Sequence, residues 1–280
     1  MNAFVMRARP RTWLLLAAGL LVATSLAAQT GWRRGGEGRY TEPLRRGLPE
    51  RRDGFMFCRL QYDSGWRFPS GYGWSTDYPR ADRNFMIRLP QITRTRMSHW
   101  ADGELGHAVV RATDPDRFSC PFLFTSDIGS ARFSGAETEG LREYLLRGGF
   151  LWVDDFWGED AWALWEQQIG RVLPEYEIRD LPLDHPLFAA YYALREVPQI
   201  PSIQSWSRTG GATQESGFEP GDPHMRAIID ERGRILVLIT HNTDIADGWE
   251  REQDNEDFFF AFTASAYGVG VNVALHVMSH

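Results

Sequence analysis

Lysine is absent from this chain of 280 residues, and all thirty basic residues are arginine. This absence excludes mechanisms that depend on a lysine side chain, namely P-loop nucleotide binding, Schiff-base and pyridoxal phosphate chemistry, and the Ser/Lys dyad. The chain also has no G-x-S-x-G elbow, no H-E-x-x-H helix and no dinucleotide fingerprint. The hydrolases, metalloproteases and dinucleotide enzymes that use those motifs are therefore not expected.

Cysteine is nearly absent. Cys58 and Cys120 each lie in an apolar, strand-like run, and neither has the spacing of a zinc ligand. The two could pair in an oxidising compartment if their strands are neighbours, but we expect two buried free thiols. We assign no metal site and no cofactor from the sequence.

The N-terminal residues have the pattern of an export signal. Three arginines precede an apolar run over residues 13–22, and small residues follow it. We expect residues 1–28 to be a cleaved signal peptide or, as the alternative, an N-terminal anchor. Residues 29–53 are rich in Gly and Arg and nearly free of aliphatic side chains, which predicts a disordered spacer. The protein is thus expected to be exported, periplasmic or anchored facing the periplasm, with membrane contact only through this N-terminal segment.

The rest of the chain, residues 54–280, has the length of one domain. The whole chain has a formal net charge of −7, and its first 53 residues are net positive, so this domain is strongly acidic. Such a surface disfavours binding to nucleic acid.

The pattern of apolar runs predicts an α/β domain. We expect strands over residues 55–62, 108–112, 121–125 and 150–153, and helices over 81–97, from Ser134 to Gly148, and after Asp155. Ser134 and Glu137 form a capping box, and Pro90 threatens the first of these helices. Residues 225–230 and 234–240 predict a late antiparallel hairpin, and residues 258–278 a buried terminal helix.

Two carboxylates mark the end of the central strand. Phe150–Val153 have no polar alternation, which predicts a strand buried on both faces that delivers Asp154 and Asp155 to its end. Because parallel strands end at one edge of a sheet, Asp63 and His241 are expected in the same crevice. Such a group can divide acid and base roles, with Asp155, His241 and Asp154 as catalytic candidates, or it can hold a divalent cation. The alternative is structural: Asp155 caps the next helix and Asp154 binds loop amides.

Two loops beside this edge supply candidate ligand-binding residues. In HNTDIADGWE the candidates are Asn242, Asp244 and Trp249, although the acids there lack the full spacing of a calcium loop. A glycine-punctuated loop and the turn after Asp155 add flat rings, which suit sugar faces; the candidates are Trp66, Tyr72, Trp74, Asp77 and Trp157. The alternative is that the rings pack on the domain itself.

The runs RLQYDSGWRFPSGYGWSTDYPRADRNF, RGGFLWVDDFWGE, LPLDHPLF and ITHNTDIADGWERE resemble an uncharacterised bacterial domain-of-unknown-function family. That family resembles the class I glutamine amidotransferase-like superfamily. The resemblance implies a flavodoxin-like, mostly parallel sheet with helices on both faces. It also implies that Asp155, or Asp154, matches the position of the superfamily's nucleophile and that His241 matches the position of its catalytic base. Neither cysteine matches the nucleophile position, so glutamine hydrolysis through a thioester is not expected.

Two functional hypotheses follow. In the first, the exported domain binds a polar small molecule, a glycan, a peptide or an envelope protein at the C-terminal edge of its sheet. In the second, it is an acid/base or metal-assisted hydrolase that uses Asp155 and His241. We favour the first, because a fold alone does not confer an activity.

Overall fold

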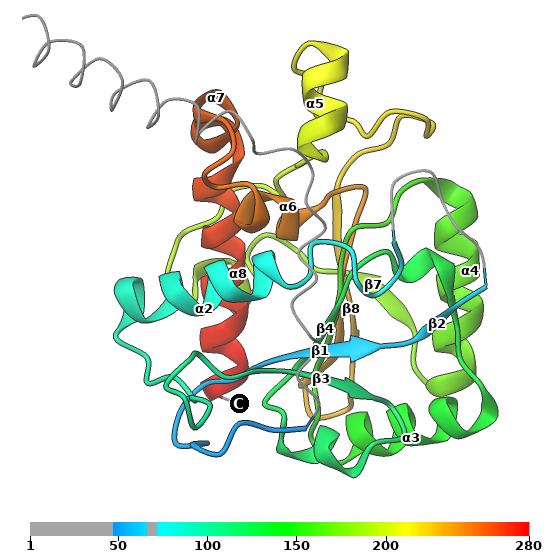
Figure 1. The fold of residues 1–280 in the computed structure, drawn as a ribbon. Helices are drawn as coiled ribbons and strands as arrows, with labels where there is room; N and C mark the ends of the chain where they lie inside the picture. Colours follow the sequence, from blue (N-terminus) through cyan, green and yellow to red (C-terminus); the bar gives the residue numbers. More distant parts are fainter. Residues whose placement is uncertain (1–46, 66–71, 280) are drawn as a thin grey trace, which may run out of the picture. The chain divides into compact units, whose positions relative to one another are not determined.

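The computed structural model of the protein describes residues 47–65 and 72–279. The expectations for residues 1–28, for most of the spacer and for Trp66 lie outside the described residues. The described residues belong to one compact unit, and Figure 1 shows its helices arranged around a central sheet.

The domain is built on a seven-stranded, mostly parallel sheet. Its strands, in spatial order, are β3 (His107–Arg111), β1 (Phe57–Gln61), β4 (Leu123–Thr125), β6 (Leu151–Val153), β9 (Ile235–His241), β8 (His224–Ile229) and β7 (Ile178–Asp180). The first five run parallel, and β8 is antiparallel to both of its neighbours. The predicted α/β class, the parallel core and the late β8–β9 hairpin are therefore confirmed. A separate two-stranded ribbon pairs β2 (Asp63–Ser64) with β5 (Ala131–Arg132).

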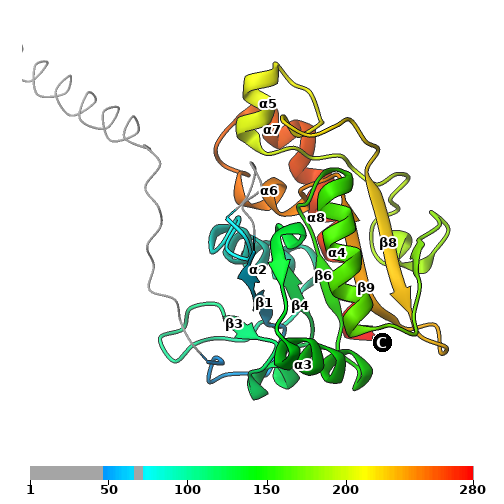
Figure 2. The ribbon, with the colours of Figure 1, turned by 90° about the vertical axis from the view of Figure 1, so that its right-hand side faces the viewer.

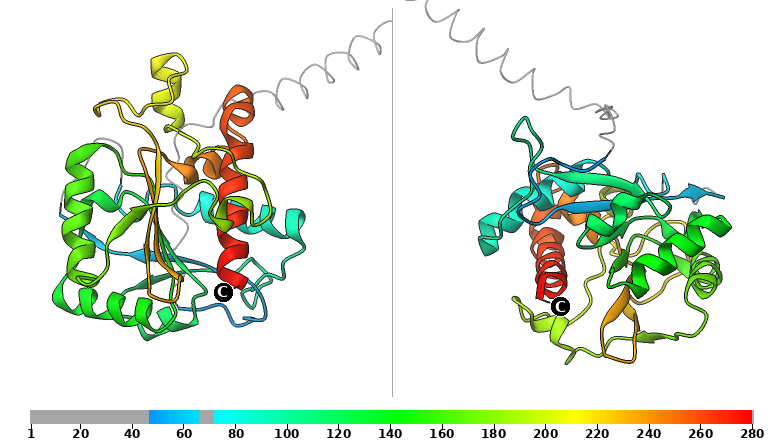
Figure 3. Two further views of the ribbon diagram at one scale, coloured as in Figure 1. Left: turned by 180° about the vertical axis from the view of Figure 1, so that it is seen from behind. Right: turned by 90° about the horizontal axis from the view of Figure 1, so that it is seen from below.

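Helices cover both faces of the sheet. They are α2 (Arg80–Thr93), α3 (Gly135–Leu146), α4 (Gly158–Val172), α5 (Ile203–Thr209), α6 (Ile245–Glu250), α7 (Glu256–Phe258) and α8 (Ala264–Ser279), and there are short 3-10 turns at Pro115–Ser119, Ile128–Ser130 and Pro186–Ala189. The helices α2, α6 and α8 share one hydrophobic core with the sheet, and α3 and α4 share another on the opposite face. Figures 1 and 2 show α4 and α8 on opposite sides of the strands, and Figure 3 shows the same layers from behind and from below.

Local sequence signals explain several helix ends. The expected capping box is present, since the Ser134 hydroxyl accepts from the Glu137 amide and the Glu137 carboxylate accepts from the Ser134 amide. Helix α2 contains Pro90 and ends at Thr93, shortly after it, with Arg94 left-handed at φ 63°. The predicted helix is thus confirmed, but it ends four residues earlier than its spacing suggested.

The C-terminal segment is a core helix, as predicted. A π-helical turn, Phe259–Thr263, joins α7 to α8, and most residues of α8 are buried. The stretch Glu256–Ser279 is long and apolar enough to cross a membrane, but 67% of its apolar window is buried within the domain.

Two expectations are wrong. Cys58 and Cys120 form a disulfide rather than free thiols, because β1 and the approach to β4 are neighbours and bring the two Cα atoms within 5.9 Å. The segment HNTDIADGWE is not a loop throughout, since α6 begins at Ile245 with Asp244 as its cap.

Candidate functional site

The C-terminal ends of the parallel strands carry an unusual concentration of strained backbone. Asp127 follows β4, Asp155 follows β6 and Asn242 follows β9, with φ angles of 50°, 53° and 57°. Asp77, in the segment before α2, has φ 64°. Left-handed non-glycine residues are uncommon and collect at functional sites, where the surrounding structure holds them in place. Four of the five such residues in the described part of the chain thus belong to this edge of the sheet.

Three carboxylates from distant segments meet here. Asp77, Asp155 and Asp244 each place one oxygen within 4.8 Å of the others, and we call them the first carboxylate group. Asp155 and Asp244 are 3% and 2% exposed, and Asp77 is half-buried. Asp155 comes from the β6–α4 turn, Asp244 caps α6, and Asp77 lies in the segment before α2. These segments are far apart in the sequence, so only folding brings the three carboxylates together.

Within residues 47–65 and 72–279, no arginine forms an ion pair with any of these three carboxylates. Their polar contacts are neutral: Asp155 accepts from the Trp157 indole N–H at 3.2 Å, Asp244 from the Asp247 amide at 2.8 Å, and Asp77 from the Ser126 hydroxyl at 3.2 Å. Burial raises the pKa of Asp155 and of Asp244 well above the usual range, and neighbouring carboxylates raise both further. Burial likewise raises the pKa of Asp77, with Arg59 opposing it only in part.

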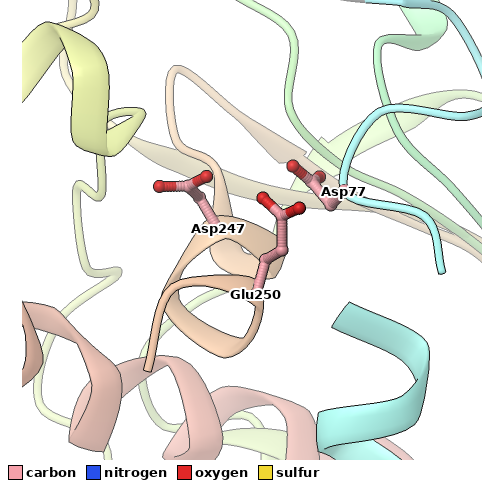
Figure 4. A group of neighbouring side chains, drawn as sticks. All are labelled: Asp77, Asp247 and Glu250. Carbon is pink, nitrogen blue, oxygen red and sulfur yellow. The ribbon is translucent and has the colours of Figure 1, made fainter. Parts of the chain in front are cut away.

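A second carboxylate group shares Asp77. Asp77, Asp247 and Glu250 also place oxygens within 4.8 Å of one another, and Figure 4 shows the Glu250 side chain turned toward Asp77. This group carries its own cation, because Arg251 Nε lies 2.7 Å from Glu250 and 3.4 Å from Asp247. The two groups are therefore alike in geometry and different in charge.

Asp154 is placed at the same edge but serves the scaffold. It is fully buried, accepts from the Thr240 hydroxyl at 2.5 Å, and accepts from the Ala246 amide at the start of α6 at 3.0 Å. Burial raises its pKa to about 7, and these hydrogen bonds moderate the rise. This geometry matches the structural alternative stated for Asp154, whereas Asp155 does not cap α4.

Asp127 and Arg59 join the site without having been assigned to it from the sequence. Asp127 accepts from the Gly73 amide at 2.8 Å, and burial raises its pKa to about 7. Arg59, fully buried in β1, binds Asp82 through two nitrogens and donates to the carbonyls of Trp74 and Thr76 at 3.1 and 2.9 Å. It thereby fixes the segment that carries Asp77. The sequence signal was a charge inside the apolar strand FMFCRLQY.

His241 ends β9 as predicted, but its ring is engaged elsewhere. Its Nδ1 lies 3.2 Å from Arg226 and its Nε2 lies 3.2 Å from the Gly158 carbonyl, and the ring packs against both Phe156 and Trp162. Burial lowers its pKa to about 4, so the imidazole is neutral at pH 7. Neither ring nitrogen contacts Asp155, and the expected Asp155–His241 pair is not formed.

Some of the other predicted residues lie near the first carboxylate group, and others do not. Trp157 contacts Asp155 directly, while Asn242 accepts from the Gly158 amide and donates to the Asp222 carbonyl, so it holds neighbouring loops together. Tyr72 is 74% exposed, and Trp74 packs on Tyr78. Trp249 is fully buried among core aromatics because α6 turns it inward, and Asp63 lies 71% exposed on the β2–β5 ribbon beside Arg111. These last two do not face the first carboxylate group.

Asp247 and Glu250 show which sequence signal was usable. They are three residues apart, which places both on one face of a helix. The sequence predicts a loop for their segment, whereas the structure forms α6 there, and only a helix gives this spacing a meaning.

Comparison with known proteins identifies a family but does not name an activity. A family model described as "Domain of unknown function (DUF4159)" matches residues 56–278, which is nearly all of the described domain. No curated protein matches the chain.

Proposed function

The chain belongs to the DUF4159 family, and from its site we propose that it is an exported cell-envelope domain that holds a divalent cation at the C-terminal edge of its sheet. Through this cation it binds a polar ligand, a glycan or a peptide. The observation that carries the proposal is the first carboxylate group, three converging acids without an ion pair among the described residues.

Charge decides which ligand suits this group. Buried carboxylates at this spacing repel one another, so they must either take up protons or accept a cation from outside. Carboxylate oxygens are the preferred ligands of hard divalent cations. Oxygens on opposite sides of a Ca²⁺ ion lie about 4.6–5.2 Å apart, given Ca–O distances of about 2.3–2.6 Å. Three oxygens that all lie within 4.8 Å of one another are close enough to share one such ion.

The cation leaves room for the polar ligand. Ca²⁺ takes about 6–8 oxygens, and three carboxylates offering one oxygen each fill at most half of these positions. Hydroxyl or carbonyl oxygens of a sugar or peptide suit the rest. The exposed ring of Tyr72, five residues before Asp77 in the chain, offers a flat surface that suits a sugar face, whereas the indole of Trp157 is buried and holds Asp155.

Two further observations support the export and fold parts of the proposal. The Cys58–Cys120 disulfide agrees with an oxidising compartment such as the periplasm. The five parallel strands, numbered in chain order, stand as 2-1-3-4-5, which is the flavodoxin-like order. Asp155 sits at the strained turn after β6, where the amidotransferase-like superfamily carries its nucleophile. With both cysteines in the disulfide, no thiolate is left for glutamine hydrolysis.

The second candidate is a metal-assisted hydrolase. Asp127, whose backbone amide donates to the Asp155 carbonyl at 3.0 Å, has a pKa raised to about 7 by burial, which suits a general base. In this version Asp155 is a metal ligand. The earlier assignment of His241 as proton carrier is less favoured, because both of its ring nitrogens are occupied.

Metal titration tests the proposal. The purified domain, stripped with EDTA, is titrated with Ca²⁺, Mg²⁺ and Mn²⁺ while its thermal unfolding is followed. We expect a saturable rise in the unfolding temperature for at least one ion, lost in Asp155→Asn and Asp244→Asn and kept in the control Asp63→Asn. No rise with any of the three ions overturns the proposal.

A panel of cell-wall glycans and peptides then separates the two candidates. Retention that depends on the bound ion, without turnover, supports the binding domain. Ion-dependent cleavage that is lost in Asp127→Asn supports the hydrolase.

A further inference from the structure

The two carboxylate groups together have the outline of a two-ion centre. Asp77 belongs to both groups, and paired metal sites in enzymes commonly share a bridging carboxylate with ions about 3.5–4 Å apart. The second group, however, already has a positive charge on it.

That charge is the guanidinium of Arg251. Its Nε lies 2.7 Å from Glu250 Oε2 and 3.4 Å from Asp247 Oδ1, and its side chain is 25% exposed. Burial by itself lowers the pKa of Arg251, but the carboxylates of Asp247 and Glu250 outweigh it, so the pKa rises and the group stays charged.

A third carboxylate holds the guanidinium in place from outside. Arg251 Nη1 donates to Asp254 at 3.2 Å, and Asp254 also accepts from Arg80 at 2.9 Å. The cation of the second group is therefore fixed on both sides and does not leave its partners freely.

We infer that Arg251 is a built-in cation that occupies the second carboxylate group and limits the site to one metal ion. This inference rests on the proposed function. It adds the number of ions and names the residue that sets it. A single ion, with Arg251 beside it, positions a polar ligand from one side only and does not clamp a phosphate between two metals.

The experiment counts ions in the full chain with Ca²⁺ as the probe. Equilibrium titration and elemental analysis are applied to the wild type and to Arg251→Gln, Arg251→Lys and Arg80→Gln. We expect one Ca²⁺ per chain in the wild type, two in Arg251→Gln, and one in Arg251→Lys, which keeps the charge. Arg80→Gln is the matched control, because it removes an arginine that binds Asp254 but not the second group, and it stays at one.

The outcomes separate this inference from the proposed function. No bound Ca²⁺ in the wild type, with none of the other ions bound, overturns the proposed function. One ion in both the wild type and Arg251→Gln overturns the role of Arg251 and leaves the proposed function standing. Two ions in the wild type also overturn that role, and this count decides even if Arg251→Gln does not fold.

Discussion

The middle of β1 and the end of β6 both bury charge, and their surroundings compensate it in opposite ways. On β1, Arg59 and Asp82 are each 0% exposed and are joined by a bidentate ion pair, with two further carbonyls accepting from the guanidinium. Past β6, Asp155 is 3% exposed and meets two more carboxylates, and no cation pairs with it among the described residues.

The contrast separates scaffold from site. A buried ion pair with all its hydrogen bonds made is complete within the chain, and it fixes the segment that carries Asp77. A buried group of like charges is incomplete and is stabilised only by protons or by a ligand. The second carboxylate group is an intermediate case, because Arg251 supplies a positive charge to it but not to the first group.

Breaking the scaffold pair should have the largest effect. Arg59→Met leaves Asp82 buried without a partner, and the free energy of unfolding should fall by about 3–5 kcal/mol, measured by urea denaturation. The control Arg142→Met removes a surface pair with Glu175 and should cost about 1 kcal/mol or less. If Arg59→Met lost no more unfolding free energy than the control, the buried pair would not be structural.

Asp155→Asn should have the opposite sign. Asparagine keeps the shape and tolerates the left-handed backbone, but it removes one of the repelling charges. In EDTA the variant should gain about 1 kcal/mol of unfolding free energy. In Ca²⁺ at about a hundred times its Kd the wild type should gain about 2.7 kcal/mol and the variant nothing. A variant that is less stable than the wild type in EDTA contradicts this view of the group.

The sequence predicted the fold better than it predicted the chemistry. Most strands and helices follow from an apolar run or a cap, as with Phe150–Val153 and the Ser134–Glu137 box, and the exception at the site is α6. The convergence of Asp155 and Asp244 at one edge followed from the parallel direction of β6 and β9. These are local or topological signals.

What the sequence missed depends on which way a side chain turns. His241 lies at the expected edge, but its ring packs against Phe156 and Trp162. Trp249 lies among the predicted ligand residues but faces the core, because α6 is a helix and not a loop. The Cys58–Cys120 pairing required knowing that β1 and β4 are neighbours, at a sequence separation of 62. Such facts belong to tertiary packing, which a single sequence does not specify.

The dependence of stability on pH sharpens the comparison further. Burial raises the pKa of Asp154 and of Asp247 from the usual 3.8 to about 7, so between these two pH values the metal-free folded state holds more protons than the unfolded state. This stabilisation is present at low pH and is lost as the pH rises through about 7. Unfolding free energy in EDTA should therefore increase from about pH 8 to about pH 6.5, and saturating Ca²⁺ should weaken the trend.

His241 opposes this pH trend below about pH 6.5. Burial lowers its pKa to about 4, so its contribution is lost as the pH falls from 6.5, against the carboxylate trend. Urea midpoints at several pH values, with and without Ca²⁺, give the measurement. Stability in EDTA that falls between about pH 8 and about pH 6.5 contradicts the raised carboxylate pKa values.

The smallest effect should come from Asp63, the acid that the sequence placed at this edge and the structure places on the β2–β5 ribbon. Its partner Arg111 lies at 2.9 Å, and the carboxylate is 71% exposed, so Asp63→Asn should cost about 0.2–1 kcal/mol in urea denaturation. Arg111 keeps a second partner, Glu137 at 3.2 Å, which limits the loss further. Ca²⁺ affinity should not change, because Asp63 is in neither carboxylate group. A tenfold weaker affinity in this variant would place the metal nearer to β2 and would contradict the assignment of Asp63 to the scaffold.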